Sequence, residues 1–337
     1  MPKRVNIDKH TNMLIIGAAN NNNNLKQIVY ADKEKEVNKT FGETSDLAKA
    51  YQVAKFFGVQ NVFLMNVRKN YDYLEICNVL KQTDFAYIVP VSILLSDVFD
   101  EPKTERRISY IEYMMEQIGH SNESVFIVTD KRAELFEDID AYIEDMNSVT
   151  EDFYDKMDLT LVNPENIVCV SNNLQYYPMS NIPLAAALCV TQPWIYPEVN
   201  FGPTLFELDA YENIGTWAYY MDHTVRSTTV ENLLNFKHIC PEKLVFISRI
   251  IKRIKREFDF SEFPGKQYSE YRRMLVEDKL RGYLEKMSKT ILYQYNILSV
   301  LPWRNKEPMT IDIENVFEVW PVNCLDKVTI KNTVEVA

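Results

Sequence analysis

The sequence predicts an α/β fold in which a mainly parallel sheet is covered by helices, followed by a smaller C-terminal α/β domain that ends in β-strands. Three observations support this prediction. The chain has 337 residues, 46% of them hydrophobic, which is enough to bury a core and to form two domains. Apolar segments alternate with helical patterns as far as Val190, and these segments are apolar on both faces, as in parallel strands buried between helices. A proline-rich and aromatic connection, Thr191 to Tyr211, then separates this region from the rest.

Each predicted element rests on its hydrophobic period and its boundary residues. A buried strand at 12–18 and an asparagine loop at 20–24 come first, and Asp32 is the expected cap of a short helix within 31–42. The later elements are strands at 61–67, 86–93, 124–130, 166–172, 309–320 and 327–336, helices at 45–57, 71–80, 103–118, 133–146 and 182–190, and helical regions within 228–258 and 269–295.

The helix at 45–57 has the clearest boundary signals. Ser45 or Thr44 can cap its first turn, and Leu47, Tyr51 and Ala54 recur at helical spacing. Gly58 stands where a left-handed residue is expected to end the helix. We therefore expect this helix to cover the strand that follows it.

Composition argues against several classes of protein. The chain has no secretory signal pattern and no run of 18 apolar residues, so we expect a soluble protein without a membrane span. The five cysteines are widely spaced beside apolar residues, which indicates buried thiols in a reducing compartment. The four histidines have no metal-ligand spacing, and we assign no metal.

Glycine is scarce, with 8 in 337 residues against a usual share of roughly 7%. Phosphate-binding loops need clustered glycines, and none are clustered here, so we predict no nucleotide and no other cofactor. A GxSxG motif is absent, and Ser92, Ser171 and Ser180 lack the flanking glycines of a nucleophile turn. We assign no catalytic residue and predict a protein that is not an enzyme.

Charge is unevenly distributed along a chain of net charge -11. The stretch from Glu134 to Asp158 has ten acids and one base. Five bases within eight residues form a candidate charged interface: Arg249, Lys252, Arg253, Lys255 and Arg256. Each stretch could be no more than a solvated helix face. An acidic and a basic stretch on one chain could also bind oppositely charged surfaces of neighbouring subunits. The overall acidity argues against direct nucleic-acid binding.

The last strand, 327–336, alternates cleanly between apolar and polar residues. Its apolar face consists of Val328, Ile330, Val334 and Val336. Such a strand at the end of a chain can pair with a neighbouring chain's sheet, or it can pair within its own domain. We predict an inter-subunit strand.

The order of these motifs resembles the contractile tail sheath family of bacteriophages and related contractile injection systems. The residues that carry the resemblance are "MLIIGAA", "SDLAKAYQVAKFFG" followed by "NVFLMNV", "TDFAYIVPVSI", and "YYPMSNIPLAAALCV", in which Ala186 and Ala187 stand where the family usually has an Ala-Gly pair. The closing "TIDIENVFEVWPVNCLDKVTIKNTVEV" resembles the last two strands of the family. The match extends from about residue 12 to the C-terminus.

The resemblance implies four segments. These are an N-terminal arm (1–11), a subtilisin-like α/β sheath domain without a working protease site (12–211), a C-terminal sheath domain (212–326) and a linking strand (327–337). The arm is short, and the large surface insertions of many sheaths are missing. The chain is therefore expected to be a near-minimal version of such a subunit.

The implied function is mechanical. Subunits would stack as hexameric rings or helical strands around a tail tube and contract to drive the tube through the envelope of a target cell. The implied partners are further copies of the chain, the tail tube protein, and baseplate and tail terminator proteins. The implied location is the contractile tail of a virion, assembled in the host bacterial cytoplasm.

Other readings stay open. The sheath could belong to a tailocin, an extracellular injection system or a secretion apparatus, which the sequence does not distinguish from a phage tail. A divergent nucleotide-dependent or hydrolytic enzyme on an α/β fold is the alternative from another class.

Overall fold

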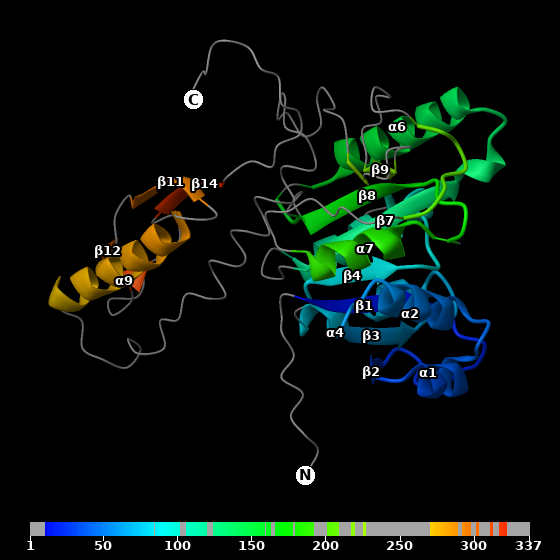
Figure 1. Ribbon diagram of the computed structural model, residues 1–337, viewed down its shortest axis with the longest axis horizontal. Helices are drawn as coiled ribbons and strands as arrows, with labels where there is room; N and C mark the ends of the chain where they lie inside the picture. The colour runs from blue at the N-terminus through cyan, green and yellow to red at the C-terminus, as the bar shows by residue number, and fades with distance from the viewer. Residues whose placement is uncertain are drawn as a thin grey trace. The chain divides into compact units, whose positions relative to one another are not determined.

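The computed structural model divides the chain into two compact units, Met1–Ser248 and Arg249–Ala337 (Figure 1). The sequence-based boundaries at 11, 211 and 326 stay predictions. The residues that the structure describes are 11–83, 85–101, 106–119, 124–158, 160–162, 166–177, 179–191, 201–208, 217–219, 225–226, 270–288, 292–297, 301–302, 311–312 and 317–321.

A six-stranded sheet organises the first unit. Neighbouring strands pair in parallel except at one edge, where β2 runs antiparallel to β3. In spatial order the strands are β2 (Ile28–Ala31), β3 (Asn61–Asn66), β1 (Asn12–Gly17), β4 (Tyr87–Pro90), β7 (Val125–Arg132) and β8 (Ile167–Asn172). The predicted α/β class with a mainly parallel sheet is confirmed.

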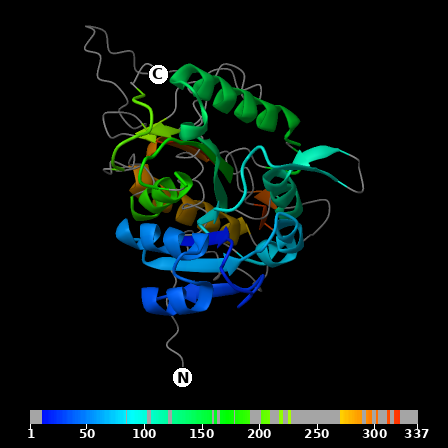
Figure 2. The same cartoon turned by 90° about the vertical axis from the view of Figure 1, so that its right-hand side faces the viewer.

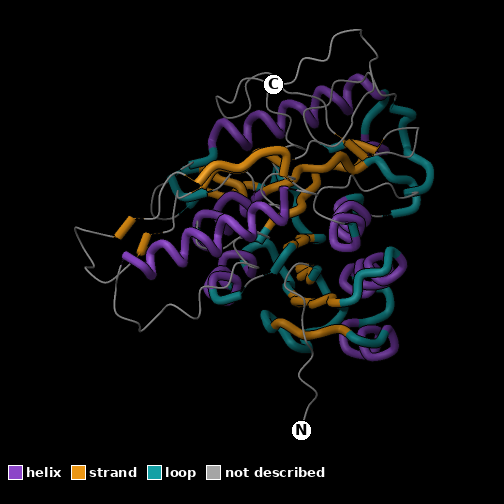
Figure 3. Tube along the Cα trace, turned by 60° about the vertical axis from the view of Figure 1, so that its left-hand side comes forward, coloured by secondary structure: helices purple, strands orange, loops and turns teal. Residues whose placement is uncertain are grey.

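Helices cover both faces of this sheet, as Figures 1 and 3 show. The first face carries α1 (Glu34–Phe41), α2 (Asp46–Phe56) and α7 (Asn181–Val190). The second face carries α3 (Asp72–Glu75), α4 (Cys77–Lys81), α5 (Tyr110–Ile118) and α6 (Ile139–Lys156).

The central strand β1 explains why the predicted strands are apolar on both faces. Met13 and Ile15 belong to the hydrophobic core on the first face, and Leu14 and Ile16 belong to the core on the second. Successive side chains of a strand point to opposite faces, so a strand between two helical layers needs apolar residues at every position.

Helix α2 forms as its local signals predict. The Ser45 side chain accepts a hydrogen bond from the Ala48 backbone N–H at 3.1 Å, which identifies Ser45 as the N-cap. Gly58 follows the helix with φ +90°, a left-handed conformation that favours glycine. Leu47, Tyr51 and Ala54 are buried. The prediction for this segment is confirmed.

Other boundaries differ from prediction. The cap of α1 is Lys33 without a side-chain bond, so the assignment to Asp32 was wrong. The expected helix at 71–80 is two short helices, α3 and α4. The expected helix at 103–118 begins only at Tyr110, because a hairpin of β5 (Val98–Asp100) and β6 (Arg107–Ser109) precedes it. Helix α6 follows a short 3₁₀ turn, η1 (Ala133–Leu135), and extends to Lys156.

The far edge of the sheet continues beyond β8. Trp217 forms a parallel bridge with Val170, and its backbone bonds both Cys169 and Ser171. The following residues form β9 (Ala218–Tyr219), which pairs antiparallel with β10 (Val225–Arg226).

In the described residues of the second unit, a long helix contacts a two-stranded antiparallel sheet. The elements are α9 (Glu270–Ser288), β11 (Leu292–Ile297), β12 (Leu301–Pro302), β13 (Ile311–Asp312) and β14 (Phe317–Pro321), with β11 paired to β14 and β12 to β13. The helical pattern predicted to 295 was wrong at its end, where β11 forms instead. The predicted helical region at 228–258 and the last strand lie outside the described residues.

Candidate functional site

The default ligand position of an open α/β sheet is the crevice at the carboxyl ends of the strands, where the strand order reverses. In this sheet the chain passes from β1 to β3 on one side and then to β4 on the other side of β1. The reversal therefore falls between the ends of β1 and β4. Gly17 ends β1, and Ser92 follows β4.

At this position the chain's own groups contact one another. The Ser92 hydroxyl accepts a hydrogen bond from the Ala18 backbone N–H at 2.8 Å and donates one to Asp46 at 3.4 Å. A Cβ atom added to Gly17 would lie 2.3 Å from Cγ2 of Val91, so the glycine here permits close packing of two strand ends. Gly17 is thus explained without a ligand.

The loop that contains the asparagine tract lies at the same carboxyl edge of the sheet, where Asn66 holds it. Asn66, at the end of β3, is buried, and its side-chain amide donates to the backbone oxygens of Asn21 at 2.9 Å and Asn23 at 3.0 Å. Its side-chain oxygen accepts from the Ala19 backbone N–H at 3.1 Å. One side chain thereby satisfies three backbone groups that regular structure leaves open.

Buried polar side chains also join β4 and β7 to α7. The side-chain amide of Asn181 donates to the backbone oxygens of Pro90 at 2.7 Å and Ile127 at 3.2 Å. The neighbouring Ser180 hydroxyl donates to Asn172 at 3.1 Å and accepts from the Leu174 backbone N–H. Ser180 is therefore buried in a structural network and does not face solvent as a nucleophile would.

A charged cluster lies beside the start of α3. The buried carboxylate of Asp72 is 3.0 Å from the ammonium of Lys26, which also contacts Glu75. Burial opposes the charge of Asp72, but the Arg68 backbone N–H and Lys26 outweigh it and lower the pKa of the carboxyl. The arrangement stabilises a turn and offers no free reactive group.

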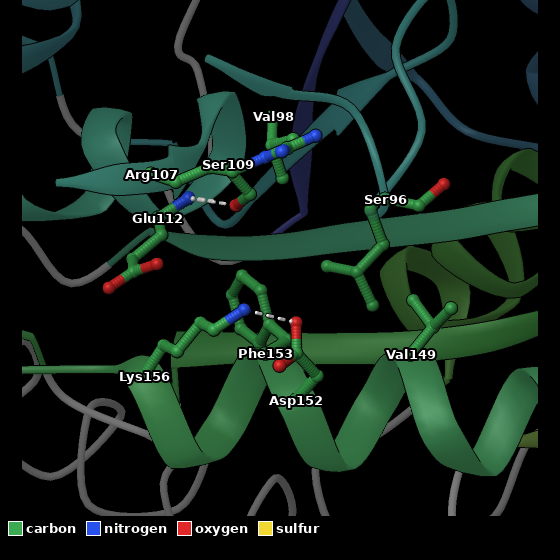
Figure 4. A pocket seen from close by; sticks show the side chains of 10 residues that line it. Ser96, Val98, Arg107, Ser109, Glu112, Val149, Asp152, Phe153 and Lys156 are labelled. Atoms are coloured by element: carbon green, nitrogen blue, oxygen red, sulfur yellow. Dashed lines mark hydrogen bonds and ion pairs between the residues drawn. The ribbon is translucent and has the colours of Figure 1, made fainter. Parts of the chain in front are cut away.

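A second charged cluster lies where the β5–β6 hairpin meets α5 and α6. The Arg106 guanidinium forms ion pairs with Glu112 and with Glu116, the latter at 3.0 Å. Beside it is a cavity of about 250 Å³. Figure 4 shows side chains of the hairpin, the start of α5 and the last turns of α6 around this cavity. Burial is the main cause that raises the pKa of Glu112, to about 7.

The acidic stretch is described and is mostly exposed. Helix α6 buries Tyr142, Met146 and Phe153 on one side. Its exposed acids are Asp140, Glu144, Glu151, Asp152 and Asp155. Three acids of the stretch form ion pairs with bases of the described residues: Glu134 with Arg132 at 2.9 Å, Asp145 with Lys131 at 2.9 Å and Asp152 with Lys156 at 2.6 Å. The stretch is therefore a strongly negative surface within the described part of the chain.

The predicted site residues are not tested by the structure. The candidate charged interface (Arg249, Lys252, Arg253, Lys255 and Arg256) and the inter-subunit strand (Val328, Ile330, Val334 and Val336) lie outside the described residues. All four histidines lie there too. Cys77, Cys169 and Cys189 are buried thiols, as predicted.

Sequence reasoning missed the Arg106 cluster. One signal for it was present: Ser109 and Glu112 have the spacing of a helix capping box. Ser109 does cap α5, accepting from the Glu112 backbone N–H at 3.0 Å, but the Glu112 carboxylate turns to Arg106.

Two further features concern the described residues. No helix among them is long and apolar enough to cross a bilayer. Nor do they bring together three or more His, Cys, Asp or Glu side chains in a way that could hold a metal ion.

Comparison with known proteins gives a match at the level of structure. Neither a protein-family profile nor a curated protein matches the sequence. A chain in the six-fold symmetrised baseplate structure of the anti-feeding prophage superposes with a TM-score of 0.61 at 10% identity, covering 97% of this chain and 94% of that one. A chain of the contracted helical sheath of the same particle gives 0.59 at 9% identity, covering 98% and 94%.

The fold of this chain is accordingly that of the contractile sheath proteins, and the resemblance seen in the sequence is confirmed at this level. The sheath tail protein of Desulfitobacterium hafniense, known from a crystal structure, is a further example. It has a TM-score of 0.56 at 9% identity, and the match covers 95% of each chain.

Proposed function

We propose that this chain is a structural subunit of a contractile sheath, which polymerises around a tail tube and contracts to drive the tube through the envelope of a target cell. The observation that carries the proposal is the extent of the structural likeness. It covers nearly the whole of this chain and of the sheath chains.

The filled carboxyl edge supports a mechanical role over an enzymatic one. Ser92, Asn66 and Asn181 use their polar groups to join strand ends and loops. A catalytic site would instead leave such groups facing a cleft where substrate could reach them.

The proposed partners are other copies of the chain in stacked hexameric or helical arrays, a tail tube protein, and baseplate and tail terminator proteins. The proposed location is the contractile tail of a virion assembled in the host cytoplasm. The subtilisin-like character of the first domain and the four-segment division of the chain belong to the same proposal. The second candidate is the sheath of a tailocin, an extracellular injection system or a secretion apparatus.

Negative-stain electron microscopy of the purified full-length protein tests the proposal. We expect rings, tubes or short stacked polymers. A protein that stays monomeric at high concentration and turns over a substrate would contradict it and favour the α/β enzyme. Neighbouring genes would separate a phage from an injection system, since a phage also encodes head and packaging proteins.

The terminal strand is tested by deleting Lys327–Ala337. If Val328, Ile330, Val334 and Val336 join neighbouring subunits, the shortened chain should fold but form no long polymers. Long polymers of normal appearance would show that the strand pairs within its own domain.

The charged interface is tested by reversing Arg249, Lys252, Arg253, Lys255 and Arg256 to glutamate. We expect impaired assembly, because these bases would no longer complement the acidic surface of α6 on a neighbour or a charged tube. The matched control reverses five exposed lysines of the first unit to glutamate, so that the change in net charge is the same: Lys33, Lys35, Lys39, Lys49 and Lys81. Equal polymer length in both variants would overturn the proposal.

A further inference from the structure

Strand β2 covers one edge of the central sheet with little burial of its own. Among the described residues it pairs with β3 alone, and it is antiparallel to β3, whereas the other neighbouring strands are parallel. Figures 1 and 2 show it at the rim of the sheet, beside α1. Of its four residues only Ala31 is buried, whereas residues 62–66 of β3 are all buried. The short strand therefore shields the edge of a strand that belongs to the core.

The turn that leads into β2 has an unfavourable backbone. Asn24 has φ +49° and Lys26 has φ +56°, both in the left-handed region. Asparagine tolerates this region, but a lysine adopts it only where surrounding contacts compensate for the cost. One such contact is the hydrogen bond from the Lys26 backbone N–H to the Asn66 oxygen at 2.9 Å.

The side chain of Lys26 supplies the other contacts. Its ammonium lies 3.0 Å from the carboxylate of Asp72 and also pairs with Glu75, so it joins the start of β2 to α3. The side chain of Asp72 is 0% exposed and that of Lys26 is 25% exposed. Water screens such a pair less than a surface pair, and loss of the cation weakens the compensation of a buried charge.

The charged groups around Asp72 favour the ionised pair. The Arg68 backbone N–H donates to the carboxylate at 2.7 Å, and the Arg68 Nε lies 4.0 Å from it. Hydrogen bonds to Glu75 and Asp72 raise the pKa of Lys26, so its ammonium stays charged at neutral pH. Without Lys26, only Arg68 among these groups would still oppose the charge of Asp72.

We propose that Lys26, through its ion pairs with Asp72 and Glu75, is a clamp that holds β2 as a detachable cover on the edge of β3. While the clamp is closed, the ion pairs compensate for the left-handed backbone of Lys26. When it opens, the turn relaxes, β2 leaves the sheet, and the edge of β3 loses its partner. The clamp does not depend on the proposed function, since all of its groups belong to one chain.

Hydrogen–deuterium exchange of the full-length protein, read by mass spectrometry on peptides that cover 24–33 and 59–67, tests the clamp. Lys26→Ala removes the ammonium and keeps a side chain that disfavours the left-handed region. After correction for intrinsic exchange, protection of the β2 amides should fall by about tenfold or more, and that of the β3 amides bonded to β2 should fall with it. The amides of β4 and β7 should keep their wild-type protection.

The matched control is Lys33→Ala. Lys33 follows β2 closely, but its ion pair with Glu36 is exposed on both sides. Because water screens an exposed pair, this variant should keep wild-type protection of β2.

Two further variants separate the ion pair from the backbone strain. Glycine adopts the left-handed region freely, so the β2 protection of Lys26→Gly should lie between that of Lys26→Ala and the wild type. Asp72→Asn weakens the same ion pair from the α3 side and should also lower β2 protection, which keeps the test valid if Lys26→Ala folds poorly.

Two results would overturn the clamp. One is wild-type protection of β2 in both Lys26→Ala and Asp72→Asn. The other is an equal loss of protection in β2, β4 and β7, which would mean that Lys26 stabilises the whole unit and not the attachment of β2. A Lys26→Gly variant no better protected than Lys26→Ala would refute the compensation of backbone strain.

Discussion

Single residues decide how closely the strands of the central sheet can approach one another. Gly17 allows the end of β1 to lie against Val91, and Asn66 and Asn181 satisfy backbone groups of neighbouring strand ends and loops. These residues do at the carboxyl edge what a bound ligand does in many α/β proteins: they occupy the space between the strand ends.

Substituting Gly17 with alanine tests this packing. The added Cβ would meet Val91 at 2.3 Å and the Ser92 hydroxyl at 3.2 Å, so the strand ends must separate. Overpacking of this kind costs about 1–3 kcal/mol of the free energy of unfolding, measurable by urea denaturation. Gly282→Ala in α9 is the control, because nothing lies within 4 Å of its added Cβ and alanine is the better helix former. Equal stability of Gly17→Ala and the wild type would contradict the packing argument.

At the scale of elements, the caps of α1 and α2 differ although the helices are neighbours. Ser45 caps α2 through its side chain, whereas Lys33 stands at the N-cap of α1 without such a bond. Only α2 therefore gains from its cap residue.

The difference predicts unequal effects of alanine. Ser45→Ala should lower the free energy of unfolding by about 0.5–2 kcal/mol, because the Ala48 N–H loses its acceptor in a buried position. Lys33→Ala should change it by no more than about 0.5 kcal/mol, since its ion pair with Glu36 is exposed. Thermal or urea unfolding monitored by circular dichroism measures both. Similar losses in the two variants would show that the Ser45 bond has no special weight.

Elements with strong local signals could be predicted from the sequence. Helix α2 has a capping serine, a regular apolar stripe and a terminal glycine, and it lies where these signals indicate. Strand β2 was not predicted, because its four residues give little local signal and it is a strand through its pairing with β3. In the sequence, the apolar pattern of α9 continues into β11 without a change. Only the pairing of β11 with β14 makes this segment a strand and not a further part of the helix.

The Arg106 cluster shows why the candidate site was harder to predict than the fold. Arg106 and Lys156 are 50 residues apart, and the burial of Glu112 depends on how α5 and α6 pack together. Sequence spacing gave the Ser109 cap but could not give the direction of the Glu112 carboxylate. Long-range packing sets that direction, and no local pattern encodes it.

On the scale of the whole molecule, the first unit contains its own core. Both large hydrophobic clusters, one on each face of the sheet, consist of residues between Met13 and Tyr219. The first unit therefore has what an independently folding domain needs.

A fragment of residues 1–248 should accordingly fold alone. We expect near-ultraviolet circular dichroism of ordered aromatic side chains and one cooperative urea transition. On the proposed function it should not form long polymers, because the terminal strand is missing. A fragment without cooperative unfolding would mean that the second unit is required for folding.

The position of β1 has a mechanical consequence. This strand pairs over six residues with β3 and over four residues with β4. A pull along β1 would load both ladders in shear at once, whereas a pull on β2 would peel a four-residue ladder from the edge, one pair after another. The sheet should thus resist tension strongly along its centre and weakly at its rim. Optical-tweezer unfolding with handles at Asn12 and Asn66, which shears β1 against β3, or at Ala31 and Val62, which peels β2 from β3, would reveal this anisotropy. Equal rupture forces would refute it.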